Sequence, residues 1–261
     1  MTLSEQIVKD IYWADDSYRR VLTLVMLFPN AAYDRLEEMT TLGEGESVRG
    51  LIAQLRRKRI IDSSTLSIGE EYKQSLERLF TETYKSPPTA SFARELERLF
   101  SEDGTLSQQS VELFESMAGE KPAPQPFFGQ PKPYYVLRTP RLCLFPLDKA
   151  PNEALIGSQA VLVAARQSGN IREQEFLPIL IAPRIPAQMV SMAIALNVDL
   201  YLLDAFSLLQ LKGLVNSVTV DTLRQMGSRL RHAFLDQPVA GLWNVSAAWL
   251  FMSLLPSEEA S

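Results

Sequence analysis

The side chains that most often do chemistry in enzymes are scarce in this chain. Cys143 is its only cysteine and His232 its only histidine. One cysteine cannot form an intramolecular disulfide, and this pair cannot supply the four clustered ligands of a structural zinc site. We expect Cys143 to be a buried thiol within a strand and His232 to be a surface or interface residue. Asp199 and Asp204 flank a predicted strand, where turn or capping roles are expected.

Motifs for other chemistries are absent from the sequence. The chain has no GxxxxGK[ST] phosphate loop, no GxGxxG segment after a strand and no G-x-S-x-G turn. The sequence therefore predicts no catalytic residues, no metal site and no cofactor.

A different kind of chemistry is indicated between Ser47 and Ile61. This segment holds five basic residues and no acid, namely Arg49, Arg56, Arg57, Lys58 and Arg59. The whole chain has a net charge of −5, which argues against coating nucleic acid by bulk electrostatics. A local cationic patch within an acidic protein is what contact with phosphates requires.

The elements around this patch are predicted to be helical. Apolar residues three and four positions apart indicate helices over 18–28, 32–39, 48–61, 72–80, 91–100 and 107–117. In the third of these, Ser47 is placed to be the N-cap. Val48, Leu51, Ile52, Leu55 and Ile60 form one apolar stripe, with Arg49, Gln54 and the remaining basic residues largely on the other side.

The residue pattern of the chain changes from helical to strand-like after a proline-rich segment. Residues 119–133 contain five prolines and two glycines, which exclude helix and favour extended chain. Beyond them, runs rich in Val, Ile, Leu and Tyr predict strands beginning near 134, 141, 160, 177 and 199. Helices are expected over 186–196, 205–214, 220–234 and 242–255. We predict an α+β chain: a helical domain over 1–118, a Pro-rich linker over 119–133 and an α/β domain over 134–261.

The order of elements from Asp15 to Leu79 resembles that of winged-helix regulators of bacteria and archaea. A short helix, a glycine-containing turn and the basic helix are followed by a wing-like stretch and a new helix. In this sequence Arg59 stands where the family usually places glycine before the wing. The resemblance implies that Arg49 and Gln54 reach base edges in DNA, whereas Arg56, Arg57, Lys58 and Arg59 contact phosphates.

The segment from Leu177 to Leu211 resembles the later part of Mrr-type restriction-endonuclease-like domains. Such domains hold a metal ion with a first acid and a Glu-x-Lys strand. Here the corresponding strand has Ala164, Ala165 and Arg166 in place of the Glu-x-Lys pattern. Asp148 could correspond to the first metal-binding acid, and it has no second carboxylate as a partner. One carboxylate is not expected to hold Mg²⁺ for hydrolysis, so the resemblance is to a degenerate, non-catalytic domain.

Two further expectations come from the ends of the chain. The first 16 residues contain acids and no apolar core of a signal peptide, which favours a cytoplasmic protein. The longest uncharged run, Gln237 to Ser257, is interrupted by polar residues and Pro238, so we expect no membrane span. Its aromatic residues predict a buried helix or a homodimer interface; they are Trp243, Trp249 and Phe251.

These observations favour a non-enzymatic DNA-binding protein. The leading hypothesis is a homodimeric transcription regulator that binds double-stranded DNA and uses its C-terminal domain for dimerisation, ligand sensing or partner contact. An alternative is an accessory subunit of a DNA-processing or defence assembly, whose domains bind other protein subunits. A metal-dependent nuclease ranks last.

Overall fold

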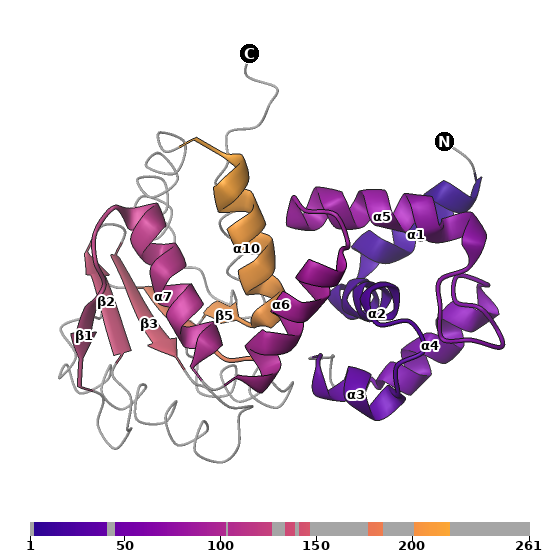
Figure 1. The fold of residues 1–261 in the computed structure, drawn as a ribbon, viewed down its shortest axis with the longest axis horizontal. Coiled ribbons are helices and arrows are strands. Elements are labelled where there is room, and N and C mark those ends of the chain that lie inside the picture. Colours follow the sequence, from indigo (N-terminus) through magenta and orange to yellow (C-terminus); the bar gives the residue numbers. More distant parts are fainter. Residues whose placement is uncertain are drawn as a thin grey trace. The chain divides into compact units, whose positions relative to one another are not determined.

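The computed structural model describes residues 3–40, 45–102, 104–126, 134–138, 141–146, 177–184 and 201–219. Helices and strands both occur, which confirms a mixed α+β chain (Figure 1). The chain divides into two compact units, Met1–Arg98 and Leu99–Ser261.

The first unit is built from helices. They are α1 (Leu3–Ala14), α2 (Asp16–Leu27), α3 (Tyr33–Glu38), α4 (Val48–Arg57), α5 (Glu70–Tyr84) and most of α6 (Ala90–Ser101). Helix α1 packs along both α2 and α5, and α4 packs against α2 and α3. The predicted helices of this part are therefore confirmed in place and order, with ends that shift by a few residues.

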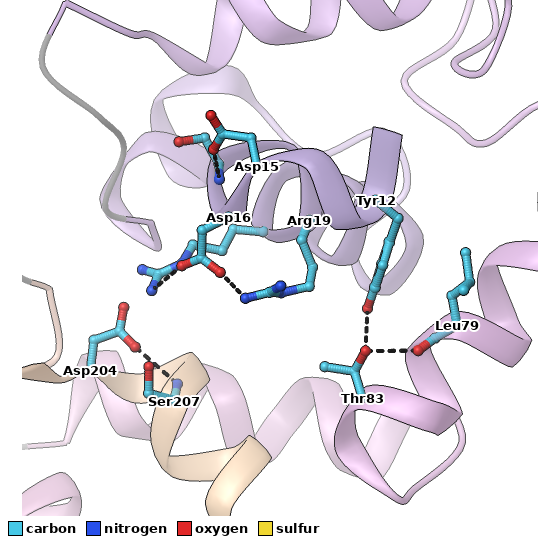
Figure 2. A network of polar contacts seen from close by, with 10 residues as sticks. Tyr12, Asp15, Asp16, Arg19, Leu79, Thr83, Asp204 and Ser207 are labelled. Carbon is cyan, nitrogen blue, oxygen red and sulfur yellow. Dashed lines mark hydrogen bonds and ion pairs between the residues drawn. The ribbon is translucent and has the colours of Figure 1, made fainter. Parts of the chain in front are cut away.

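Helix α1 was not predicted from the sequence. Its buried residues Val8 and Tyr12 lie on one face, four positions apart. The phenol of Tyr12 donates a hydrogen bond to Oγ1 of Thr83 in α5 at 3.0 Å, and Figure 2 shows these two side chains pointing toward each other. Burial raises the pKa of the Tyr12 hydroxyl, so this group stays protonated and keeps its donor. The contact ties the start of the chain to a helix about seventy residues later.

The helix predicted over 48–61 is shorter in the structure. Helix α4 ends at Arg57, and Arg59 adopts a left-handed backbone conformation with φ of 61°. The chain then turns, and Ile61 forms one antiparallel bridge with Ile68. Ile60 and Ile61 lie outside the helix but are buried. Their apolar side chains fitted the helical pattern because they pack in the core, although the chain there has already left the helix.

The second unit contains a five-stranded mixed sheet in the order β1-β2-β3-β4-β5. Its strands are β1 (Ala123–Gln125), β2 (Tyr134–Arg138), β3 (Arg141–Pro146), β4 (Leu177–Ile181) and β5 (Tyr201–Leu203). The first three strands pair antiparallel, whereas β3, β4 and β5 pair in parallel. Four of these strands were predicted; β1 was not, because its residues are Ala-Pro-Gln. A proline-bearing strand is compatible with the edge position that β1 occupies.

In the described part of the second unit, two helices pack with this sheet. Helix α7 (Thr105–Ala118) packs against β3 and β4, and α10 (Ala205–Ser217) packs against α7 and β5 (Figure 1). Because α7 packs on the sheet, the compact units divide near Arg98, before this helix, rather than at the predicted linker 119–133. Part of that predicted linker is β1, which belongs to the sheet.

Several predicted elements lie outside the described residues. These are the strand near 160 and the helices over 186–196, 220–234 and 242–255.

The buried Tyr12–Thr83 hydrogen bond provides a first prediction. Replacing Tyr12 with Phe keeps the ring and removes the donor, which leaves the buried Thr83 hydroxyl one partner short. We expect a loss of about 0.5–1.5 kcal/mol in the free energy of unfolding. Urea denaturation of the full chain measures it.

Leu3→Ala is the matched control in the same helix. Leu3 is 78% exposed, so its truncation should change stability by less than about 0.5 kcal/mol. Equal stabilities for Tyr12→Phe and the parent chain would contradict the role given to the hydrogen bond.

Candidate nucleic-acid interface

Helix α4 has one buried face and one exposed face. Val48, Leu51, Ile52 and Leu55 are all buried. The exposed positions form a second stripe, because they are one or three residues apart and a helix places such positions on the same side. They are Arg49, Gly50, Ala53, Gln54 and Arg57.

The start of α4 is capped as the sequence predicted. The Ser47 hydroxyl accepts a hydrogen bond from the backbone N–H of Gly50 at 3.1 Å. Gly50 and Ala53 lie side by side in the middle of the exposed stripe and have no side-chain atoms beyond Cβ. The exposed face is therefore shallow at its centre, and its long side chains project from either end.

Arg49 is held at the N-terminal end of this face by two residues of α3. Its guanidinium lies 5.2 Å from the ring centre of Tyr33, and its Nη2 is 3.4 Å from a carboxylate oxygen of Asp34. Both partners in the ion pair remain exposed, at 67% for Arg49 and 83% for Asp34. An exposed pair of this kind contributes about 0–1 kcal/mol, so a stronger partner can displace the carboxylate.

Gln54 contacts α2. The hydroxyl of Tyr18 donates a hydrogen bond to Oε1 of Gln54. The amide nitrogen Nε2 is bonded to the same carbon as Oε1 and therefore points away from Tyr18. Gln54 is exposed, and the hydrogen bond from Tyr18 engages its Oε1 and none of its Nε2 hydrogens.

Three basic residues follow at the C-terminal end of α4. Arg57, Lys58 and Arg59 are all exposed. Among the residues that the structure describes, none of the three forms an ion pair with a carboxylate. Their charges are thus available to an anionic partner.

Arg56 is placed differently from its neighbours. Its Nε donates to the backbone carbonyl of Asp62 at 3.1 Å, and its Nη2 donates to that of Thr65 at 3.2 Å. The sequence grouped Arg56 with the phosphate-contacting residues. In the structure its guanidinium spans the turn that follows α4 and holds two of its carbonyls.

This turn, residues 61–68, is organised by further polar contacts. One carboxylate oxygen of Asp62 accepts from the backbone N–H groups of Ser64 and Thr65, each at 2.8 Å, and from both of their hydroxyls. The side-chain hydrogen bond from Ser64 is the largest cause that holds the pKa of Asp62 well below its usual range, and the backbone N–H of Thr65 adds to it. Asp62 therefore stays ionised at any pH near neutrality.

Asn30 connects the turn to the segment between α2 and α3. Its backbone N–H donates to the carbonyl of Leu66 at 2.8 Å, and its side-chain oxygen accepts from the N–H of Leu66 at 3.2 Å. Asn30 has φ of 63°, a conformation that asparagine tolerates better than most residues. This two-way pairing fixes the turn against the segment between α2 and α3.

Sequence reasoning missed these supporting residues. Tyr18, Asn30, Tyr33 and Asp62 all orient or brace the predicted site, but each reaches it from another element or across a turn. Only Asp62-Ser63-Ser64-Thr65 carried a local signal, because aspartate followed by hydroxyl residues is typical of a side-chain-stabilised turn.

Of the other residues that the sequence singled out, the structure describes Cys143 and Asp204. Cys143 is buried in β3, as expected. Asp204 caps α10 by accepting from the N–H of Ser207 at 2.9 Å, which confirms its predicted capping role (Figure 2). Several predicted residues lie outside the described residues, namely Asp148, Ala164, Ala165, Arg166, Asp199, His232, Trp243, Trp249 and Phe251.

Two other kinds of site, a metal centre and a membrane span, depend on features that the described residues can show. Within them, no three of the His, Cys, Asp and Glu side chains come together as metal ligands would. No helix in the described part of the chain has both the length and the apolar character needed to cross a membrane.

No protein-family model matches this chain, and no curated protein or solved structure does so either. Its function has to be inferred from the chemistry of the described residues.

The left-handed backbone at Arg59 predicts how substitutions there affect stability. Arg59→Gly and Arg59→Ala remove the same charge, but only glycine adopts φ near 61° without a steric penalty. We expect the Gly variant to be more stable than the Ala variant by about 1 kcal/mol. Urea denaturation of both variants measures the difference, and a more stable Ala variant would show that the backbone there is not strained.

The hydrogen bonds of Asp62 predict how the turn responds to its loss. Asp62→Ala removes the acceptor of two backbone N–H groups, so the amide hydrogens of Ser64 and Thr65 should exchange with solvent faster. Hydrogen exchange followed by NMR measures this rate. Ser63→Ala is the control, because no hydrogen bond of the Ser63 side chain braces the turn, and it should leave both rates unchanged.

Proposed function

We propose that the first unit is a winged-helix domain that binds double-stranded DNA, with α4 as its recognition helix and the turn 61–68 as its wing. The observation that supports this most directly is the exposed face of α4. That face and the two residues that follow α4 carry Arg49, Gln54, Arg57, Lys58 and Arg59, and residues 48–59 contain no carboxylate.

The position of Arg49 favours a ligand over a purely structural role for the cations. Basic residues in the last turn of a helix stabilise its negative end by about 0.3–1 kcal/mol each, which could account for Arg57. Arg49 lies in the first turn of α4, where the helix dipole disfavours a positive charge. A cation at each end of one exposed face suits a polyanion that runs along the helix.

The dimensions of α4 also fit this partner. Ten residues of α-helix extend about 15 Å, and the major groove of DNA is about 12 Å wide. Gly50 and Ala53 leave the centre of the exposed face shallow, so the helix backbone can approach base edges closely. Arg57, Lys58 and Arg59 lie where the helix would leave the groove and are suited to phosphates.

The proposal extends to the rest of the chain. We propose a non-enzymatic regulator of transcription, acting as a homodimer in the cytoplasm, whose second unit mediates dimerisation or senses a ligand. The use of Asp204 as a helix cap supports a structural role for that acid rather than a catalytic one.

Binding to duplex DNA should depend on Arg57 and Lys58. We expect the variant R57A/K58A to bind duplexes more weakly and to reduce the slope of log K against log salt by about 2, because two phosphate contacts are lost. Fluorescence anisotropy with a labelled duplex at several salt concentrations measures both quantities.

The matched control is K9A/R94A. Lys9 in α1 and Arg94 in α6 are exposed, so this variant removes the same charge from other surfaces of the chain. Equal affinities and salt slopes for the two double variants would contradict DNA binding by α4. That outcome would favour the accessory-subunit hypothesis, in which the same surface contacts protein.

A further inference from the structure

We infer that α4 is built to recognise guanine in the major groove. This inference rests on the proposed function and adds the chemical class of base that the domain prefers. It follows from the exposed stripe of α4, which presents hydrogen-bond donors and whose one side-chain acceptor, Oε1 of Gln54, is directed toward Tyr18 of α2.

The two arginines of the stripe can only donate. A guanidinium has five N–H donors and no acceptor. Arg49 is also partly positioned before any ligand binds, because its guanidinium lies over the Tyr33 ring at 5.2 Å. A planar donor fork that is already restrained loses less freedom when it pairs with two acceptors.

Gln54 decides the preference, because glutamine can normally read adenine. Reading adenine with two bonds requires Oε1 to accept from the base amino group while Nε2 donates to N7. In this structure one lone pair of Oε1 already accepts from the Tyr18 hydroxyl, which directs Oε1 toward α2. Two-bond pairing with adenine would require the amide to turn away from Tyr18 and lose this bond, whereas in the observed orientation the two Nε2 hydrogens remain available as donors, like those of the arginines.

Guanine is the base that matches a face made of donors. In the major groove guanine presents two acceptors, N7 and O6, whereas adenine and cytosine each present an amino donor. Thymine offers one acceptor and a methyl group. Arg49 and Gln54 are five positions apart, or about 7.5 Å along the helix, which is about two base-pair steps.

The first test uses the full chain and modified duplexes. Sites are selected from a random duplex pool, and guanines in the enriched sequence are then replaced one at a time. We expect guanines two to three pairs apart to be enriched. Substitution by 7-deazaguanine, which removes the major-groove N7, should weaken binding roughly fivefold or more. Inosine lacks only the minor-groove amino group of guanine and should bind nearly as well as guanine.

The second test releases Gln54. Tyr18→Phe removes the hydroxyl that engages Oε1 and keeps the ring, so Gln54 regains its ability to pair with adenine. Repeating the selection with this variant should raise the frequency of adenine at one position and leave the guanine contacted by Arg49 unchanged. Tyr135→Phe in β2 removes a phenol from the second unit and should give the same site as the parent chain.

The outcomes separate this inference from the function on which it rests. Enriched sites without guanine, or affinity that is insensitive to 7-deazaguanine and sensitive to inosine, would overturn the guanine preference while DNA binding stands. An unchanged adenine frequency in Tyr18→Phe would overturn the role of the Tyr18–Gln54 contact. No binding to any duplex in the pool would overturn the proposed function itself.

Discussion

The buried apolar stripe of α4 is the constraint on which the candidate interface depends. Val48, Leu51, Ile52 and Leu55 are removed from water as α4 packs on α2 and α3. Each buried side chain of this size contributes about 1.5–3 kcal/mol. Rotating the helix would expose this stripe and bury arginines, so the hydrophobic effect sets which face meets solvent. Because the apolar residues of α4 are buried on one face, its polar residues are left together on the opposite face, in solvent.

The turn after α4 is held in a different way. Ile61, Leu66 and Ile68 are its buried anchors, and hydrogen bonds hold the more exposed residues between them. Arg56 and Asn30 reach this turn from α4 and from the α2–α3 segment, so its position is coupled to both. Gly69 closes it at a point where an added Cβ would lie 3.0 Å from the carbonyl oxygen of Arg59. A side chain would crowd the backbone there, and this explains why glycine occupies that position.

The second unit shows how similar residue types can serve packing instead of a site. Helix α10 has buried residues around most of its circumference, and its Asp204 is buried with a carboxylate oxygen bound to the helix start. A helix that is apolar on most sides has to be covered on several sides. Cys143 is likewise buried within β3. In both cases the polar atom lies within a packed element.

The sequence by itself determined the local elements of this protein. Apolar spacing located α2 to α7 and α10, and β-rich runs located β2 to β5, because helix and strand periods depend on near neighbours. It also identified the cation-rich segment and the Ser47 cap, which are properties of adjacent residues.

Only the tertiary structure decided which polar side chains of this segment are used in hydrogen bonds within the protein and which remain exposed. The sequence treats Arg56 and Arg57 alike, but Arg56 binds carbonyls of the turn whereas Arg57 remains exposed. The orientation of the Gln54 amide depends on Tyr18, 36 residues earlier in the chain. Strand β1 went unpredicted because Ala-Pro-Gln has no run of β-forming residues, and only its pairing with β2 makes it a strand. Helix α1 packs along α5, about seventy residues later in the chain. Side-chain hydrogen bonds act over about 3 Å, and only folding brings such distant groups within that range.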